Sequence, residues 1–162
     1  MSLDKKATRA ISSLAHRSVI LDCVGIFGAR YLFLLMVLYG VAWLWKHMED
    51  FWTFLFSILI GWVIALVLEY TIRRERPYKV KNLKPLSRPA IETPSFPSGH
   101  ATISFAAAVS IWFVDPTLGL VFSGLAILVA LSRVYVGVHY VSDIIAGALL
   151  GAFVSCLVTF FF

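Results

Sequence analysis

Two short polar stretches of this sequence contain the side chains best suited to chemistry on an anion. Residues 97–100 read Pro-Ser-Gly-His, and Ser132-Arg133 is followed by His139 and Asp143. The last two residues are four positions apart, so they lie on one helical face if the last helix begins near His139. A carboxylate bonded to one ring nitrogen fixes the imidazole tautomer and leaves the other nitrogen free to attack phosphorus. The spacing therefore predicts His139 as a nucleophile and Asp143 as the group that orients it.

Four further residues have the chemistry needed to hold a phosphate group, and one could act as an acid. Ser98 is a good helix N-cap, and the backbone N–H groups of a helix that starts there stabilise an anion. Gly99 lets a phosphoryl oxygen approach the backbone closely. Arg76 and Arg133 carry paired donors that match phosphate oxygens, and His100 is the candidate acid for the leaving oxygen. No cluster of carboxylates, cysteines or further histidines indicates a metal site in the sequence, so we expect neither a metal nor a cofactor.

Apolar segments between these motifs would bring them to one place. Residues 101–114 and 116–132 carry no charge and are joined by a short turn. If both form helices across a membrane, His100 and Arg133 return to the same side. A third apolar segment ends near Arg76, where the following proline cannot continue a helix. We therefore expect an anion site at one end of a helical bundle.

The composition is that of an integral membrane protein. Of 162 residues, 60% are hydrophobic and 14% charged, and the mean hydropathy is +0.87, outside the range of soluble domains. The apolar runs are continuous, which excludes the alternating pattern of a β-barrel. A spanning helix needs about 20 residues, and slightly fewer where polar ends line a site. We predict an all-α integral membrane protein with one domain over residues 1–162 and five transmembrane helices, formed by residues 23–45 (interrupted by Arg30), 51–68, 101–114, 116–132 and 144–162.

The N-terminal segment has the pattern of a helix that lies in the headgroup layer. Leu3, Ala7, Ile11 and Leu14 share one helical face, and basic side chains lie elsewhere. We predict an interfacial amphipathic helix within residues 1–20. A solvated helix or a loose tail is the alternative.

Residues 73–97 form the only long loop that the sequence predicts. They contain several prolines and basic residues and lead directly into the Pro-Ser-Gly-His motif. Long loops in compact proteins usually either have a function or are disordered. We expect this active-site loop to act as a lid and a phosphate-attracting rim, with plain anchoring at the interface as the alternative.

Three motifs together resemble the signatures of the type 2 phosphatidic-acid phosphatase superfamily, and the resemblance covers roughly residues 20 to 160. It implies a core helix bundle shared with vanadium haloperoxidases and a metal-independent lipid phosphatase that works through a phosphohistidine intermediate. It also implies His139 as the nucleophile, Asp143 as its orienter and His100 as the acid, with four residues on the phosphate. The motifs are Arg76-Pro77, Pro97-Ser98-Gly99-His100 and Ser132-Arg133 with His139 and Asp143, and the phosphate ligands are Arg76, Ser98, Gly99 and Arg133.

The sequence departs from the superfamily pattern at Glu69, where the first signature usually has a lysine. This signature, together with residues 11–15 and Leu21-Asp22, is most similar to the bacterial undecaprenyl-diphosphate phosphatases of the bacitracin-resistance branch, enzymes of cell-wall biogenesis. The resemblance implies a polyprenyl diphosphate substrate, hydrolysed to the monophosphate.

Glu69 could pair across helices with Arg30, which lies about two turns inside the first span. An ion pair with Arg73, four residues further on, is the alternative.

Two other functions fit parts of the pattern. The same site would serve a phosphatase of phosphatidic acid, phosphatidylglycerophosphate or another lipid phosphate. A non-catalytic lipid or anion binder would need no nucleophile with an orienting carboxylate, and the sequence retains His100, His139 and Asp143. The expected partners are a lipid phosphate and membrane lipids and no nucleic acid, and the sequence predicts no particular oligomeric state.

Two arguments disagree on membrane orientation. Of fourteen Lys and Arg residues, only Lys46 falls on the side opposite the expected site, so the positive-inside rule places the site in the cytoplasm. The family resemblance implies a site at the outer face of the bacterial plasma membrane. We expect the extracytoplasmic orientation, because the substrate pool of this branch is there.

Overall fold

The computed structural model of the chain describes residues 3–81, 84–89 and 91–162, and all regular structure in them is helical. The prediction of an all-α protein is confirmed. Eight α-helices and one π-helical segment follow one another along the chain: α1 Leu3–Ser12, α2 Val19–Phe27, η1 Gly28–Leu32, α3 Phe33–Leu44, α4 Met48–Ile72, α5 Pro77–Lys81, α6 Gly99–Val114, α7 Pro116–Tyr135 and α8 Val141–Phe161.

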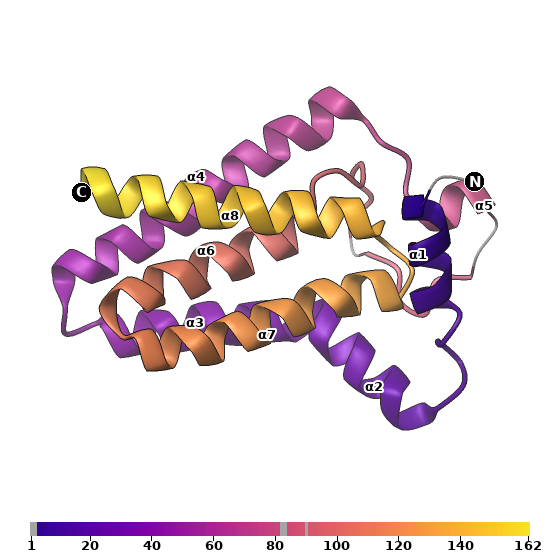
Figure 1. The fold of residues 1–162 in the computed structure, drawn as a ribbon, viewed down its shortest axis with the longest axis horizontal. Helices are drawn as coiled ribbons and strands as arrows, with labels where there is room; N and C mark the ends of the chain where they lie inside the picture. Colours follow the sequence, from indigo (N-terminus) through magenta and orange to yellow (C-terminus); the bar gives the residue numbers. More distant parts are fainter. Residues whose placement is uncertain (1–2, 82–83, 90) are drawn as a thin grey trace.

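Helix α6 lies at the centre of the bundle. It packs against α3, α4, α7 and α8 (Figure 1). The approach of α8 is close enough to require glycine, since a Cβ at Gly147 would lie 2.5 Å from the carbonyl oxygen of Ser98, and one at Gly151 would collide with the backbone of Thr102. This contact brings the first turn of α8 beside the start of α6, where the predicted site residues are.

Helices α6 and α7 form the predicted hairpin because Asp115 caps the second of them. Its carboxylate accepts hydrogen bonds from the backbone N–H groups of Thr117 and Leu118, at 2.8 and 3.0 Å. Pro116 occupies the first position of α7, where its fixed φ suits a helix and its missing N–H costs nothing. The tight turn returns the chain to the end of the bundle from which α6 started.

In the described part of the chain, four stretches are long and apolar enough to cross a membrane: Val19–Leu44, Met48–Val80 (in which α4 ends at Ile72), Pro116–Tyr135 and Val141–Phe161. The protein is therefore an integral membrane protein. The fifth expected span corresponds to α6, which has 16 residues and is about 24 Å long against a hydrocarbon core of about 30 Å. Four of the five predicted spans are thus confirmed by length and composition, and the fifth stays a prediction.

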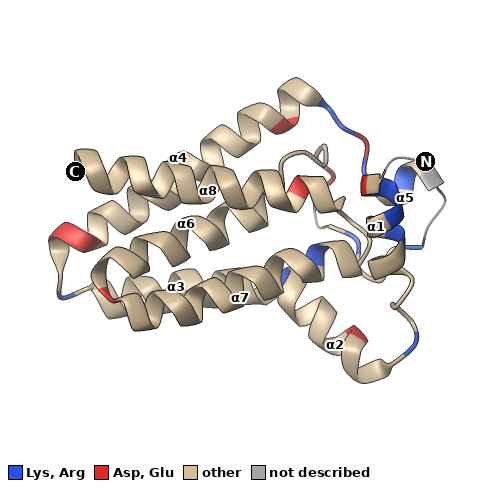
Figure 2. Ribbon diagram, in the orientation of Figure 1, with Lys and Arg blue, Asp and Glu red and all other residues tan. Residues whose placement is uncertain are grey.

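Charged residues gather at one end of the bundle, as the sequence suggested. Figure 2 shows most of the basic residues around α1, α5 and the loop between α4 and α6. The opposite end has Lys46, Glu49, Asp50 and Asp115. The folded chain therefore keeps the excess of basic residues at the site end. By the positive-inside rule, this excess argues against a site at the outer face of the membrane.

Helix α1 crosses the charged end of the bundle and packs against α7 and α8 (Figure 1). It ends at Ser12, so the predicted amphipathic helix is shorter than residues 1–20. The sequence did not predict which face of this helix packs on the bundle. Thr8 is buried and Asp4 half-buried, whereas Leu3 and Ala7 are exposed. Polar groups at the start of α8 need partners, and α1 meets them with its polar side.

Candidate active site

His139 lies in the turn between α7 and α8 and is 1% exposed. The turn reverses the chain at Gly137, whose φ of +83° falls in the left-handed region that favours glycine. The Nδ1 atom of His139 is 2.8 Å from the carbonyl oxygen of Ser95. Because a carbonyl can only accept, Nδ1 carries the proton and Nε2 is left with its lone pair.

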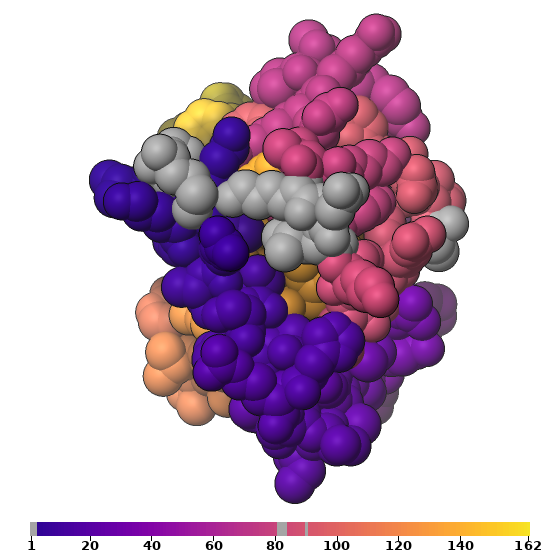
Figure 3. All heavy atoms as spheres, turned by 90° about the vertical axis from the view of Figure 1, so that its right-hand side faces the viewer, coloured from indigo at the N-terminus to yellow at the C-terminus, as the bar shows by residue number. Residues whose placement is uncertain are grey.

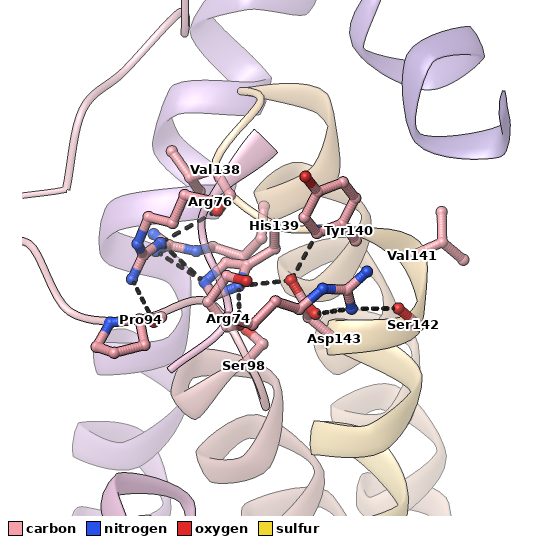
Figure 4. A network of polar contacts seen from close by, with 12 residues as sticks. Arg74, Arg76, Pro94, Ser98, Val138, His139, Tyr140, Val141, Ser142 and Asp143 are labelled. Atoms are coloured by element: carbon pink, nitrogen blue, oxygen red, sulfur yellow. Dashed lines mark hydrogen bonds and ion pairs between the residues drawn. The ribbon is translucent and has the colours of Figure 1, made fainter. Parts of the chain in front are cut away.

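Two guanidinium groups face this lone pair, and Figure 4 shows that of Arg76 beside His139. Nε2 of His139 is 3.3 Å from Nη1 of Arg76 and 3.5 Å from Nη2 of Arg133. Burial holds the pKa of His139 well below its usual value, and the positive charges of Arg133 and Arg76 add to this effect. The imidazole is therefore neutral, which a nucleophile requires.

Backbone carbonyl groups fix both arginines in place. Arg76 is 4% exposed and donates to the carbonyl oxygens of Thr93 and Val138, at 2.7 and 3.1 Å. Arg133 is 6% exposed and donates to the carbonyl oxygen of Ala29 at 2.8 Å. Among the residues that the structure describes, the buried Nε atom of Arg133 has no hydrogen-bond partner, so this donor could serve a ligand.

Ser98 occupies the N-cap position of α6, as the sequence predicted, but its side chain makes no capping hydrogen bond. Its backbone N–H donates to the carbonyl oxygen of Asp143 at 3.0 Å. The hydroxyl group is fully buried and has no hydrogen-bond partner within residues 3–81, 84–89 and 91–162. A buried hydroxyl without a partner is costly, so Ser98 provides a second unused donor beside the two arginines.

His100 and Gly99 form the first turn of α6, beside these groups. The ring of His100 packs against the ring of Phe33, with 4.3 Å between centroids. A Cβ at Gly99 would lie 3.7 Å from Oε1 of Glu69. The structure therefore places both residues at the same end of the bundle as the arginines, while the acid role of His100 stays a prediction.

Asp143 is fully buried, and its carboxylate has three neighbours. Oδ2 accepts from the backbone N–H of Tyr140 at 2.8 Å and lies 3.5 Å from Nδ1 of His139. Oδ1 accepts from Nη1 of Arg74 at 2.6 Å. The sequence predicted that Asp143 alone would orient His139, and the structure adds the nearer carbonyl oxygen of Ser95.

Sequence reasoning missed Arg74, which contacts Asp143 directly. Arg74 stands in the run Arg73-Arg74-Glu75-Arg76, and its position before Arg76-Pro77 was the only available signal. Backbone acceptors such as Ser95 have no signature, since every residue has a carbonyl group.

The expected pair between Arg30 and Glu69 is wrong. Arg30 donates to the side chain of Ser87 at 2.7 Å and to the carbonyl oxygen of Arg88 at 3.3 Å, so it holds the active-site loop instead. Glu69 is 6% exposed and lies near Arg76 and Arg133. Among the described side chains, no ion pair joins Glu69 to Arg30 or to the alternative partner, Arg73.

Similarity to known proteins shows the family and the fold of this chain. A family model described as the PAP2 superfamily matches residues 50–162. This chain belongs to the PAP2 superfamily. Its helices superpose on those of LpxE from Aquifex aeolicus with a TM-score of 0.82 at 21% identity, over 99% of this chain and 97% of the other. They superpose on a PAP2 type phosphatidylglycerolphosphate phosphatase from Bacillus subtilis with a TM-score of 0.76 at 26% identity, over 98% of this chain and 83% of the other.

Relatives with named functions include two diphosphatases and a lipid A phosphatase. The chain is 40% identical to an undecaprenyl-diphosphatase of Sulfolobus acidocaldarius, over 62% of this chain and 52% of the relative. It is 38% identical to a lipid A 1-phosphatase of Rhizobium johnstonii, over 66% of this chain and 46% of the relative. It is 28% identical to the undecaprenyl-diphosphatase BcrC of Bacillus subtilis, over 92% of this chain and 79% of the relative. The matched parts of the first two relatives are thus only about half of their length. These matches confirm the resemblance to the PAP2 superfamily and to its bacitracin-resistance branch.

The neutral state of His139 predicts how stability depends on pH. In the unfolded chain, His139 becomes protonated as the pH falls below about 6.5. In the folded chain the pKa of His139 is lower, so the imidazole stays neutral at that pH. Below that pH the unfolded state binds the extra proton, so stability falls as the pH falls. The melting temperature in detergent should therefore drop more steeply in the wild type than in His139→Gln between about pH 7.5 and 5.

The exposed residue His47, at the opposite end of the bundle, supplies the matched control. His47→Gln should keep the steep wild-type dependence. An equal slope in the wild type and in His139→Gln would contradict a neutral, buried His139.

Proposed function

We propose that this chain is a lipid phosphatase that removes the terminal phosphate of a polyprenyl diphosphate, such as undecaprenyl diphosphate, through a phosphohistidine intermediate on His139. The observation that carries the proposal is the position of Nε2 of His139, which is unprotonated and faces Arg76 and Arg133. A phosphoryl group placed there would meet a nucleophile and two bidentate donors together.

Unused donors support the same position for the phosphate. The Nε atom of Arg133 and the hydroxyl group of Ser98 are both buried without partners. Buried polar groups are usually hydrogen-bonded, and exceptions call for an explanation. A bound phosphoryl group supplies one, because its three oxygens can accept from both groups at once.

The reaction has two balanced steps. In the first, a P–N bond forms to Nε2 of His139 while the P–O bond to the leaving group breaks, and His100 donates a proton to the leaving oxygen. The product is a polyprenyl monophosphate. In the second, water attacks the phosphorus and gives a proton back to His100, the P–N bond breaks, and inorganic phosphate leaves. The two arginines stabilise the charge that develops on the equatorial oxygens, so the mechanism assigns no role to a metal.

The named relatives support a polyprenyl diphosphate as the substrate. Two of them, including one matched over 92% of this chain, are called undecaprenyl-diphosphatases. Phosphatidic acid and phosphatidylglycerophosphate remain the second candidates, because one solved structure with this fold is a phosphatidylglycerolphosphate phosphatase at 26% identity.

Phosphate release by the purified protein tests both the reaction and the substrate. We expect a kcat/KM for undecaprenyl diphosphate about tenfold or more above those for phosphatidic acid and phosphatidylglycerophosphate, and the same rates in EDTA. His139→Ala should release no phosphate, and His47→Ala, which changes an exposed histidine, should match the wild type.

The possible failures point to different errors. Full activity of His139→Ala would rule out the proposed nucleophile. Loss of activity in EDTA that Mg²⁺ restores would rule out the metal-independent mechanism. A preference for one of the glycerophospholipids would keep the mechanism and replace the substrate.

We also propose that the site opens to the outer face of the plasma membrane. The proposal rests on the substrate, since polyprenyl diphosphate is released at that face, and it runs against the basic residues gathered at the site end. The site arginines and loop lysines contribute to that excess, because a phosphate site needs positive charge at its rim.

Cysteine labelling in intact cells tests the orientation. Lys84 is exposed in the active-site loop, and Cys23 and Cys156 are the two native cysteines. Lys84→Cys in a background without native cysteines should react with a membrane-impermeant maleimide. A cysteine at Lys46, at the opposite end of the bundle, should react only after the cells are opened. The reverse pattern would place the site in the cytoplasm.

A further inference from the structure

The N-terminal helix α1 turns a polar stripe toward the bundle. Asp4, Thr8 and Ile11 lie on one face, at the spacing of successive helical turns. Thr8 is 2% exposed, and Asp4 and Ile11 are half-buried, while the large apolar side chain of Leu3 is exposed. Figure 3 looks onto this end of the molecule and shows the N-terminal segment lying across it, with part of residues 73–97 beside it.

This stripe supplies partners for the first turn of α8. Thr8 accepts a hydrogen bond from the backbone N–H of Val141 at 3.1 Å. Asp4 accepts from the backbone N–H of Ser142 at 3.0 Å and from its hydroxyl group at 2.7 Å. The first N–H groups of a helix have no partner within the helix, so α1 caps α8 from outside.

Arg74 joins the same stripe to Asp143. Its Nη2 atom is 2.7 Å from Oδ2 of Asp4, and its Nη1 atom is 2.6 Å from Oδ1 of Asp143. Nη1 also donates to the hydroxyl group of Ser142 at 2.6 Å, and the guanidinium lies 4.1 Å from the centroid of the Tyr140 ring. One guanidinium therefore bridges the carboxylate of Asp4 and the carboxylate of Asp143, and Figure 4 shows the second of these contacts.

Arg74 and the backbone N–H of Tyr140 together set the rotation of the Asp143 carboxylate, because Arg74 holds Oδ1 and Tyr140 holds Oδ2. One oxygen of Asp143 contacts Arg74, and the other lies 3.5 Å from Nδ1 of His139. Arg74 is only partly buried, with 28% of its side chain exposed, and a long side chain needs a second anchor to hold one rotamer. Asp4 is that anchor. Burial alone would raise the pKa of Asp4, but hydrogen bonds from Ser142 and Arg74 hold it below its usual value, so Asp4 is ionised.

We propose that Asp4 and Arg74 are positioning residues for the His139–Asp143 pair, which makes the docked helix α1 a working part of the active site. In this proposal Asp4 acts on the pair through Arg74, and its hydrogen bonds to Ser142 serve to dock α1 on α8. This inference rests on the proposed function, since it assigns a role within the phosphatase reaction.

A double-mutant cycle on turnover tests this relay, by which we mean the path from Asp4 through Arg74 to Asp143. Asp4→Ala and Arg74→Ala should each lower kcat about tenfold, since small displacements of catalytic groups are costly, while KM stays within about twofold because neither residue touches the substrate. The double variant should be no slower than Arg74→Ala, because removing Asp4 has no further effect once Arg74 is gone.

Thr8→Val is the matched control on the same helix. Thr8 contributes to the docking of α1 through Val141, and in the described part of the chain its side chain makes no hydrogen bond to Arg74. The variant should lose melting temperature like Asp4→Ala and keep kcat within about twofold of the wild type. Asp4→Asn, which keeps an acceptor for Ser142 and removes the charge, should behave like Asp4→Ala in kcat.

Several results would overturn the inference. Losses of kcat that multiply in the double variant would show that Asp4 acts independently of Arg74. An unchanged kcat in Asp4→Ala and Asp4→Asn would show that the relay has no effect on catalysis. An equal loss of kcat in Thr8→Val would show that α1 matters only by being docked.

A second readout separates this inference from the proposed function. If the wild type released no phosphate from any of the lipids, the proposed function would fail. The relay would then be judged on the binding of orthovanadate, a phosphate analogue, to the same proteins. Affinity should fall about tenfold in each single variant and no further in the double variant, and unchanged affinity would refute the relay.

Discussion

Two guanidinium groups held side by side in a buried site are the constraint on which this structure depends. Arg76 and Arg133 are nearly inaccessible and both point at one atom, Nε2 of His139. Burying two like charges is expensive unless they are paired and hydrogen-bonded. Hydrogen bonds from the arginines to backbone carbonyl oxygens, and the nearby carboxylate of Glu69, offset part of this free-energy cost. In the proposed function, a bound phosphoryl group offsets the rest of the cost, which would make the site selective for that ligand.

The helical bundle serves this constraint by bringing together four separate parts of the chain. The π-helical segment Gly28–Leu32 contributes the carbonyl group that holds Arg133, and the loop after α4 contributes Arg76 and the carbonyl group of Ser95. Tight packing of α8 on α6 at Gly147 sets the first turn of α8 against Ser98. Apolar packing of the spans therefore fixes the distances on which the polar chemistry relies.

Local patterns made much of this predictable. The apolar runs predicted helices, the Asp115-Pro116 pair predicted the hairpin, and the four-residue spacing of His139 and Asp143 predicted their proximity. What could not be predicted depends on long-range geometry. The acceptors Ser95 and Ala29 act through backbone groups that every residue has. Arg74 forms an ion pair with Asp4, about seventy positions away in the sequence. The N–H groups at the start of α8 determine which face of α1 is buried, and the apolar residues of α1 do not.

The central claim is that the phosphoryl group is transferred to Nε2 of His139. Rapid quenching during turnover of undecaprenyl diphosphate labelled in its terminal phosphate, followed by mass spectrometry of the peptide that contains residues 134–143, tests it most directly. The account predicts an acid-labile, base-stable phosphate on His139 that forms within the first turnover and is absent from His139→Ala. Turnover without a labelled protein, or a label on another residue, would contradict it.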